Sequence, residues 1–353
     1  MEIDVLADKI RQWGIELGFS DVGFANTKLH DYELRLLEWL GDGMHGEMRF
    51  MEKHGNKRSR PEKLVNGTVG IISVRMNYLD KDAEDADTIL EQPEKAYISR
   101  YALGRDYHKL IRKRLQKLAD KITQAIGPFA YRAFSDSAPV LEKPLAEQAG
   151  LGWIGKHTLL LNRDAGSWFF LGELYTDLPL PPSAPKENHC GSCTRCIDIC
   201  PTQAIVAPYK LDARRCIAYL TIEFKGSIPI ALRPLIGNRI FGCDDCQLVC
   251  PWNRYAGYSA EQKFRTLHNL DAADLVELFA WSEQEFCDKL AGSAIKRSSY
   301  ESWLRNIAVA LGNAPSSDKI IQALKARLHH TSEIVREHVQ WALEQHTLYM
   351  RTS

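Results

Sequence analysis

Eight of the nine cysteines fall into two groups whose spacing suits metal chemistry. The segment HCGSCTRCIDICP places Cys190, Cys193, Cys196 and Cys200 at the spacing C-x2-C-x2-C-x3-C-P. The second group is Cys216, Cys243, Cys246 and Cys250, and its end, GCDDCQLVCP, repeats the C-x2-C-x3-C-P part. Four thiolates match one [4Fe-4S] cluster, so the pattern predicts two such clusters. Two zinc sites are the alternative, because C-x2-C pairs also bind zinc.

The order of the cysteines predicts how the ligands divide between the clusters. In two-cluster ferredoxins the first three cysteines of a run hold one cluster, and the fourth reaches the other. This rule assigns Cys190, Cys193, Cys196 and Cys250 to the first cluster, and Cys200, Cys216, Cys243 and Cys246 to the second. A long insertion separates Cys216 from Cys243, so we expect an additional element there. Cys287 stands alone and is interpreted as a structural thiol.

Composition limits the classes of protein that remain. The 353 residues contain 45 basic and 45 acidic side chains, which excludes a wholly basic nucleic-acid binder but not a local basic face. The start, MEIDVLADKIRQW, has no apolar core of a signal peptide, and no run of 18 apolar residues exists, so we expect no membrane association. A cytoplasmic location follows as the default expectation. Thiols stay reduced there, which favours metal over disulfides.

Hydrophobic periodicity predicts an α+β protein with three domains. Helices are expected over residues 3–17 and 106–125, and strands over 21–25, 69–79 and 165–175. A proline-rich linker at 177–187 precedes the cysteines. The chain is expected to be helical from about residue 270. We therefore predict a mixed α and β domain at 1–180, a two-cluster ferredoxin-like domain at 181–265 and a helical domain at 266–353.

Two C-terminal segments resemble each other. LRNIAVALGN (304–313) and REHVQWALEQ (336–345) align at an offset of 32 residues, which is typical of short HEAT-like helical repeats. Two unrelated amphipathic helices are the alternative interpretation.

The most distinctive part of the front half is FSDSAPVLEKPLAEQAGLGWIGKH. Asp136 stands where a strand is expected to end and a helix to begin, so by itself it is a candidate helix N-cap. GLGWIGKH would let the backbone approach a large ligand closely, but it lacks the G-x-G-x-x-G pattern of a Rossmann site. His157 alone is interpreted as a structural histidine.

These segments resemble the epoxyqueuosine reductase family, and the resemblance extends from about residue 20 to 345. It also includes the segments SRYALGRDYHKLIRKRLQKLA, GSWFFLGEL, CIAYLTIE and IGNRIFGCDDCQLVCPWN. The resemblance implies reduction of epoxyqueuosine to queuosine at the wobble position of tRNA. It also implies that residues 1–180 form a cobalamin-binding catalytic domain, that two [4Fe-4S] clusters pass electrons to this cobalamin, and that the chain is related to cobalamin-dependent reductive dehalogenases. The partners expected are tRNA and an external low-potential donor such as a flavodoxin or ferredoxin. We expect a monomer.

The resemblance also implies site residues. It places the catalytic proton donor at Asp136, whose pKa we expect to be raised by burial beside the corrin. The implied cobalamin-binding residues are Arg58, Ser99, Asp136, Lys156, His157, Leu171, Thr221, Gly242, Asp244 and Asp245. The D-x-H-x-x-G motif of histidine-ligated cobalamin is absent, because DYHKLI (106–111) has Ile where Gly is required. No lower axial ligand of cobalt is therefore predicted.

Candidate tRNA-binding surfaces are basic segments in three places: Lys109, Arg112, Lys113 and Arg114; Lys225 and Arg239; and Lys296 and Arg297. Each is alternatively a solvated face. The alternative functions are a small-molecule reductase of the dehalogenase type, a ferredoxin-type electron-transfer protein, and a tRNA-binding adaptor with structural clusters. Corrin binding together with tRNA-dependent redox chemistry would distinguish an epoxyqueuosine reductase from these three alternatives.

Overall fold

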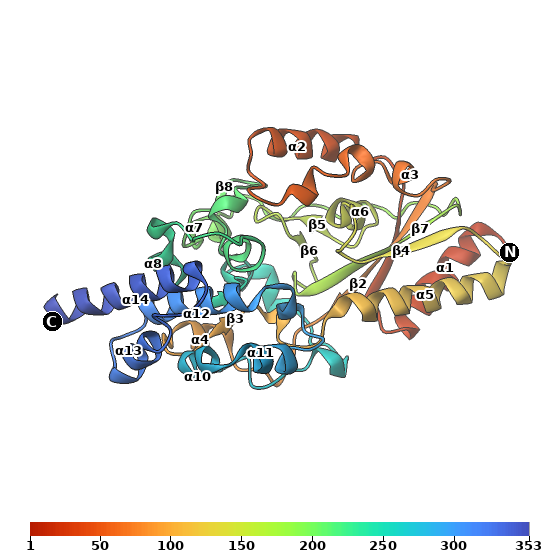
Figure 1. Cartoon of the computed structure of the whole chain (residues 1–353). Coiled ribbons are helices and arrows are strands. Elements are labelled where there is room, and N and C mark those ends of the chain that lie inside the picture. Colours follow the sequence, from red (N-terminus) through yellow and green to blue (C-terminus); the bar gives the residue numbers. More distant parts are fainter. Residues whose placement is uncertain (353) are drawn as a thin grey trace.

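A four-stranded antiparallel sheet forms the centre of the front half (Figure 1). This computed structural model describes residues 1–352, and side chains as far as residue 348. Across the sheet the strands are β1 (Asp21–Ala25), β2 (Gly70–Asn77), β7 (Phe169–Thr176) and β4 (Tyr131–Phe134). The strands expected over 21–25, 69–79 and 165–175 are confirmed, with small shifts at their ends.

Helices cover both faces of this sheet because its strands alternate between two apolar faces. Helices α1 (Ile3–Glu16) and α5 (Tyr107–Ile126) pack on one face, where Phe170 and Leu174 of β7 point. Helix α6 (Glu142–Gln148) packs on the other, where Phe169 and Tyr175 point. The two helices predicted at 3–17 and 106–125 are confirmed as α1 and α5. The start of α5 and the loop before α6 lie near one end of the sheet, where the candidate site forms.

The two cysteine runs meet through short helices. Helix α7 (Arg195–Asp198) packs on α9 (Asp245–Leu248), and a hairpin of β8 (Ile205–Ala207) and β9 (Lys210–Leu211) follows α7. The expected insertion contains a π-helical turn (Tyr219–Glu223), α8 (Arg233–Ile236) and β10 (Arg239–Phe241). Strand β10 pairs in parallel with β3 (Tyr97–Ile98), so the insertion is tied to the front half.

The C-terminal part is helical, as expected. It comprises α10 (Leu275–Ala280), α11 (Glu283–Lys289), α12 (Tyr300–Asn313), α13 (Asp318–Lys325) and α14 (Glu333–Thr352). The two similar segments lie on α12 and α14, which pack against each other. These helices share one hydrophobic core with the insertion and with Ile98 and Leu103. The three-domain division and the HEAT-like interpretation stay predictions.

Shorter elements complete the fold. They are α2 (His30–Gly41), α3 (Pro61–Leu64), α4 (Ala86–Leu90), β5 (Trp153–Ile154) and β6 (Leu160–Leu161). Within residues 1–352, every helix is too short or too polar to cross a bilayer.

Candidate active site

Each predicted set of four cysteines lines a cavity of its own. Cys190, Cys193, Cys196 and Cys250 all line a cavity of about 190 Å³. Cys200, Cys216, Cys243 and Cys246 all line a second cavity of about 460 Å³. Burial, with the neighbouring Cys190, Cys250 and Cys193, raises the pKa of Cys196 to about 11. Metal ligation requires the thiolate, so a bound cluster would displace this proton, and the four cysteines around each cavity match the ligand set of one iron–sulfur cluster.

The larger cavity, called here the reaction cavity, extends from the second cysteine set to Asp136. Its walls carry the aromatic side chains Tyr78, Tyr101, Tyr107, Phe169 and Phe170. Of the predicted cofactor residues, those that line it are Ser99, Asp136, His157, Gly242, Asp244 and Asp245. Six of the ten predicted cofactor residues therefore gather at one cavity, although they come from segments far apart in the chain.

Four predicted cofactor residues lie outside that lining. Lys156 lines the smaller cavity instead, and its Nζ donates to the carbonyls of Gly191 at 2.7 Å and Cys193 at 2.9 Å. Thr221 is fully buried, and its Oγ1 accepts a hydrogen bond from the Gly242 amide at 2.9 Å.

The remaining two, Leu171 and Arg58, contact other parts of the protein. The Leu171 carbonyl accepts a hydrogen bond from Ser135 Oγ at 3.2 Å. Arg58 is buried, and its Nη2 donates to the Phe50 carbonyl at 2.9 Å. Direct cofactor contacts for all four residues stay predictions.

Two acidic residues of the predicted cofactor set, Asp244 and Asp245, already have hydrogen-bond or ion-pair partners within the protein. Asp244 accepts hydrogen bonds from Tyr97 Oη at 2.9 Å and Ser99 Oγ at 2.6 Å. Asp245 forms an ion pair with Arg239. Both carboxylates therefore hold the loop that carries Gly242 and Cys243.

The Asp136 carboxylate is held by three side chains that the sequence analysis did not single out for this purpose. Its Oδ2 accepts a hydrogen bond from Tyr107 Oη at 3.1 Å and lies 3.1 Å from His108 Nε2. Arg297 Nη1 is 3.7 Å from the same oxygen. The Asp136 side chain is 52% exposed, so it remains open to the cavity.

The backbone of Asp136 adopts an unusual conformation. Its φ is 55°, a left-handed value that costs energy for a residue with a Cβ and often occurs at functional sites. Its amide donates to Glu142 Oε1 at 2.5 Å, which helps to hold this conformation. The N-cap interpretation is wrong, because α6 starts only at Glu142 and Leu141 occupies the cap position.

His108 links Asp136 to a second carboxylate. Its Nδ1 lies 2.5 Å from Asp106 Oδ1, while its Nε2 faces Asp136. Burial lowers the pKa of His108, but the hydrogen bonds to Asp106 and Asp136 outweigh burial and raise it overall. For Asp106, the same hydrogen bonding outweighs the effect of burial and lowers the pKa to about 2. Both ring nitrogens of His108 face a carboxylate oxygen, an arrangement that favours the protonated imidazole.

The expected rise in the pKa of Asp136 is wrong. Burial does raise it, but the hydrogen bond and charge of His108, with Tyr107 and Arg297, outweigh burial and lower the pKa below its usual value. The raised carboxyl pKa belongs to the neighbouring Glu142, at about 7, because that side chain is buried and close to the charge of Asp136. Two groups that can carry a proton therefore face Asp136 Oδ2 at 3.1 Å, His108 Nε2 and Tyr107 Oη.

A large cofactor fits beside these residues. A cavity of about 910 Å³ adjoins the reaction cavity, since Lys143, Thr158 and Leu211 line both. His157 lines the reaction cavity and the smaller cysteine cavity. Its Nδ1 accepts from the Leu159 amide, so the neutral ring carries its proton on Nε2, which is buried without a partner among the described residues. A ligand filling the cavity would satisfy that donor.

Gly242 marks a place where the chain approaches closely. Its φ is 72°, and a Cβ there would come within 2.5 Å of Ser99 Cβ. A residue with a side chain would therefore disturb the cavity wall beside Cys243. Such tight walls and mostly apolar linings are typical of sites for large organic cofactors.

Comparison with known proteins identifies the family. Residues 58–137 match the family described as "Epoxyqueuosine reductase QueG, DUF1730", and residues 189–253 match the "4Fe-4S double cluster binding domain". The epoxyqueuosine reductase of Pseudomonas aeruginosa is 62% identical over 342 residues, covering 97% of this chain and 94% of that protein. This chain belongs to the epoxyqueuosine reductase family. The epoxyqueuosine reductase of Escherichia coli K12 is 56% identical, covering 98% of this chain and 90% of that protein.

Solved structures of epoxyqueuosine reductases share the fold. The enzyme from Streptococcus thermophilus has a TM-score of 0.87 and 27% identity, covering 99% of this chain and 94% of its own. An epoxyqueuosine reductase with an epoxyqueuosine-modified tRNA stem-loop has a TM-score of 0.83 and 25% identity, covering 98% of this chain and all of its own. A third structure, of the Bacillus subtilis epoxyqueuosine reductase, has a TM-score of 0.85 and 28% identity, covering 98% of this chain and 91% of its own. In that structure a catalytic aspartate loop is swung out of the active site.

Proposed function

We propose that this chain reduces epoxyqueuosine to queuosine at the wobble position of tRNA, with electrons passing through two [4Fe-4S] clusters to cobalamin. The observation that carries the proposal is the reaction cavity, which connects four cysteines to a carboxylate with its own proton source. Membership of the epoxyqueuosine reductase family and the relative with a bound tRNA stem-loop support it.

The cofactors would be held by residues already described. The two cysteine sets would hold the clusters, and Ser99, His157 and Gly242 would border the cobalamin, with the adjoining 910 Å³ cavity available for its bulk. When bound and reduced, cobalamin supplies the electrons that open the epoxide. His157 Nε2 would donate a hydrogen bond to the cofactor, because this buried donor otherwise has no partner within the described structure.

The chain itself supplies the proton. Two electrons and two protons convert the epoxide into an alkene and water, and the first C–O cleavage builds negative charge on oxygen. A positioned acid is needed at that oxygen. Asp136 would contact it, and the proton held at His108 Nε2 would pass through the Asp136 carboxyl to the substrate oxygen. Arg297 and Tyr107 would hold the carboxylate in place during the transfer.

The first cluster would occupy the smaller cavity, which Trp252 and His189 also line, and an external low-potential flavodoxin or ferredoxin would deliver electrons there. We propose a cytoplasmic monomer that acts on tRNA.

An anaerobic turnover assay tests the proposal. Protein reconstituted with iron and sulfide is incubated with cobalamin, a strong reductant and tRNA that carries epoxyqueuosine, and the digested nucleosides are identified by mass. Loss of one oxygen that depends on cobalamin is the expected result. An unchanged nucleoside, with both clusters and the corrin bound, would contradict the proposed substrate.

A further inference from the structure

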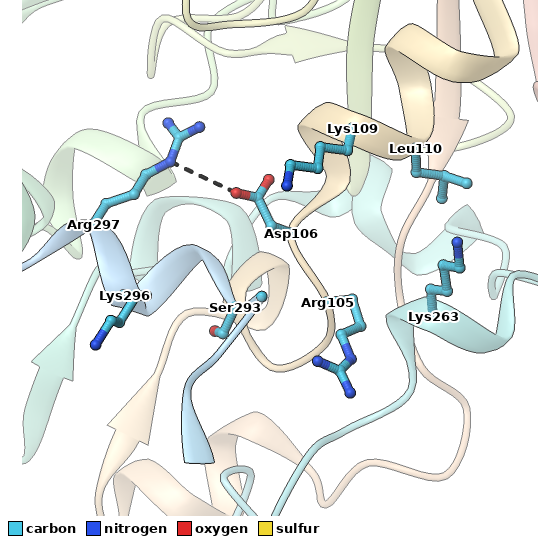
Figure 2. Close-up of a pocket in the computed structure, with 9 residues that line it drawn as sticks. Arg105, Asp106, Lys109, Leu110, Lys263, Ser293, Lys296 and Arg297 are labelled. Carbon is cyan, nitrogen blue, oxygen red and sulfur yellow. Dashed lines mark ion pairs between the residues drawn. The ribbon is translucent and has the colours of Figure 1, made fainter. Parts of the chain in front are cut away.

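A basic cavity of about 550 Å³ opens beside the Asp106–His108 pair (Figure 2). Five cations line it: Arg105, Lys109, Lys263, Lys296 and Arg297. They come from the start of α5, from the turn Gln262–Phe264 and from the turn Ala294–Arg297. Asp106 is the one carboxylate among the lining residues, so positive charge dominates this cavity.

Most of this charge is not neutralised by the protein. Asp106 is already engaged by His108. Lys109, Lys263 and Lys296 are exposed, and no ion pair involves them among the residues whose side chains the structure describes. Arg105 uses Nη1 to donate to the Ala291 carbonyl at 2.7 Å. Cations that line one hollow from three separate segments attract an anion more strongly than a flat solvated face does.

The basic cavity combines residues from two of the candidate tRNA surfaces and leaves out others. Lys109 belongs to the first predicted surface, and Lys296 and Arg297 belong to the third. Arg114 is instead paired with Glu261, and Arg239 with Asp245, so neither is free for an external anion. Arg105 and Lys263 were not predicted, because only the fold brings them to the same hollow.

Arg297 connects this cavity to the reacting carboxylate. Its Nε lies 3.8 Å from Asp106 Oδ2, and its Nη1 lies 3.7 Å from Asp136 Oδ2. Figure 2 shows its side chain directed toward Asp106, above Lys296 and opposite Lys109. An anion in the basic cavity would therefore sit next to whatever group contacts Asp136.

We propose that the basic cavity binds a backbone phosphate of the RNA strand beside the modified nucleoside, while that nucleoside enters the reaction cavity. The inference rests on the proposed function. A nucleoside taken out of a loop keeps its flanking phosphates, which are the anions nearest to its base. Lysine and arginine contacts to phosphates fix the position of a strand without reading its sequence. The cavity thus positions the epoxide against Asp136.

Binding of an epoxyqueuosine-containing tRNA stem-loop to the cluster-loaded, cobalamin-loaded protein tests the inference. The double variant Lys109→Gln/Lys296→Gln removes two cations from the cavity, and Lys9→Gln/Lys28→Gln removes two exposed cations elsewhere. We expect the cavity variant to bind at least about fivefold more weakly, with a salt dependence reduced by roughly 0.7 per lost contact. The control variant should match the wild type.

A second arm localises the contact to a phosphate. Stem-loops with a neutral methylphosphonate at single linkages around the modified nucleoside are compared with the unmodified RNA. At one linkage the methylphosphonate should weaken binding to the wild type but not weaken further the binding to the cavity variant, since both changes remove the same contact. Equal binding by cavity variant and control, or purely additive effects at every linkage, would overturn the inference. Failure of the wild type to bind the stem-loop would instead overturn the proposed function.

Discussion

His108 determines where a proton can rest near the carboxylate of Asp136, the proposed proton donor. It lies between Asp106 and Asp136, and its pKa is raised because these two hydrogen bonds outweigh its burial. The pKa of Asp136 is lowered for the same reason. Burial could be anticipated for Asp136 from the resemblance, but the partners that reverse its effect could not. Tyr107 and His108 are 29 and 28 residues away from Asp136 in the chain, and Arg297 comes from a different part of the fold.

Replacing His108 with Gln should lower stability in a pH-dependent way. A histidine with a raised folded-state pKa contributes its full stability below about pH 6.5, and that contribution disappears as the pH rises through the folded-state pKa. We expect the Tm of His108→Gln to lie about 2–4 °C below that of the wild type at pH 6. The difference should shrink by pH 9. Thermal unfolding of both proteins across this range measures it, and a constant difference would contradict the assigned charge.

The same substitution should remove the proton source from turnover. Wild-type turnover is expected to fall as the pH rises through the raised pKa of His108. His108→Gln should be slower by about 10²-fold or more at neutral pH, and it should lose that alkaline decline. Single-turnover rates on saturating tRNA, measured from pH 6 to 9, provide the check. A variant with the wild-type pH profile would exclude His108 as the source.

At the scale of elements, the C-terminal helices support the loop that carries the second cysteine set. The buried Arg305 of α12 donates to the carbonyls of Leu220 at 2.6 Å, Phe224 at 2.9 Å and Gly226 at 2.8 Å. Its neighbour Asn306 donates to the Thr221 carbonyl at 2.8 Å and the Ile240 carbonyl at 2.9 Å. Helix α12 thus satisfies backbone groups on both sides of the insertion.

Arg305→Lys should therefore destabilise the holoprotein and weaken retention of the second cluster. A lysine presents three donors from one nitrogen and cannot reproduce the planar fork, so buried carbonyls lose partners. We expect the Tm to fall by about 5 °C or more, together with loss of iron. Arg11→Lys, at an exposed pair on α1, is the matched control and should change neither quantity. Unchanged iron content and Tm in Arg305→Lys would contradict this role.

The elements themselves were largely predictable, while their association was not. Apolar spacing alone predicted α1 and α5, because an amphipathic helix records its own buried face in the sequence. No local sequence pattern indicates the pairing of β10 with β3, or the hydrophobic core that the insertion shares with the C-terminal helices. They depend on contacts between Phe241, Ile98 and Leu304, which are far apart in the chain.

At the scale of the whole molecule, the last cysteine of each run lies in the cavity that the other run lines. Cys250 lies with Cys190, Cys193 and Cys196, and Cys200 lies with the second set. Spacing predicted this grouping because ligand geometry is a property of the metal chemistry and needs little knowledge of the fold.

Iron content of cysteine variants tests this grouping. Cys200→Ser and Cys216→Ser should each remove about half of the iron, and the double variant no more than either alone. Cys200→Ser combined with Cys193→Ser should lose nearly all iron, since the two residues then serve different clusters. Ligation within each run would be indicated instead if this second pair lost only half.

The central claim is that Asp136 delivers the proton for epoxide opening in a cavity shared with the second cluster. It is tested most directly by anaerobic turnover of Asp136→Asn beside the wild type, with nucleosides identified by mass. The account predicts that the variant keeps both clusters, cobalamin and tRNA binding, yet removes oxygen from epoxyqueuosine at least about 10²-fold more slowly. Near-normal oxygen removal by Asp136→Asn would contradict it.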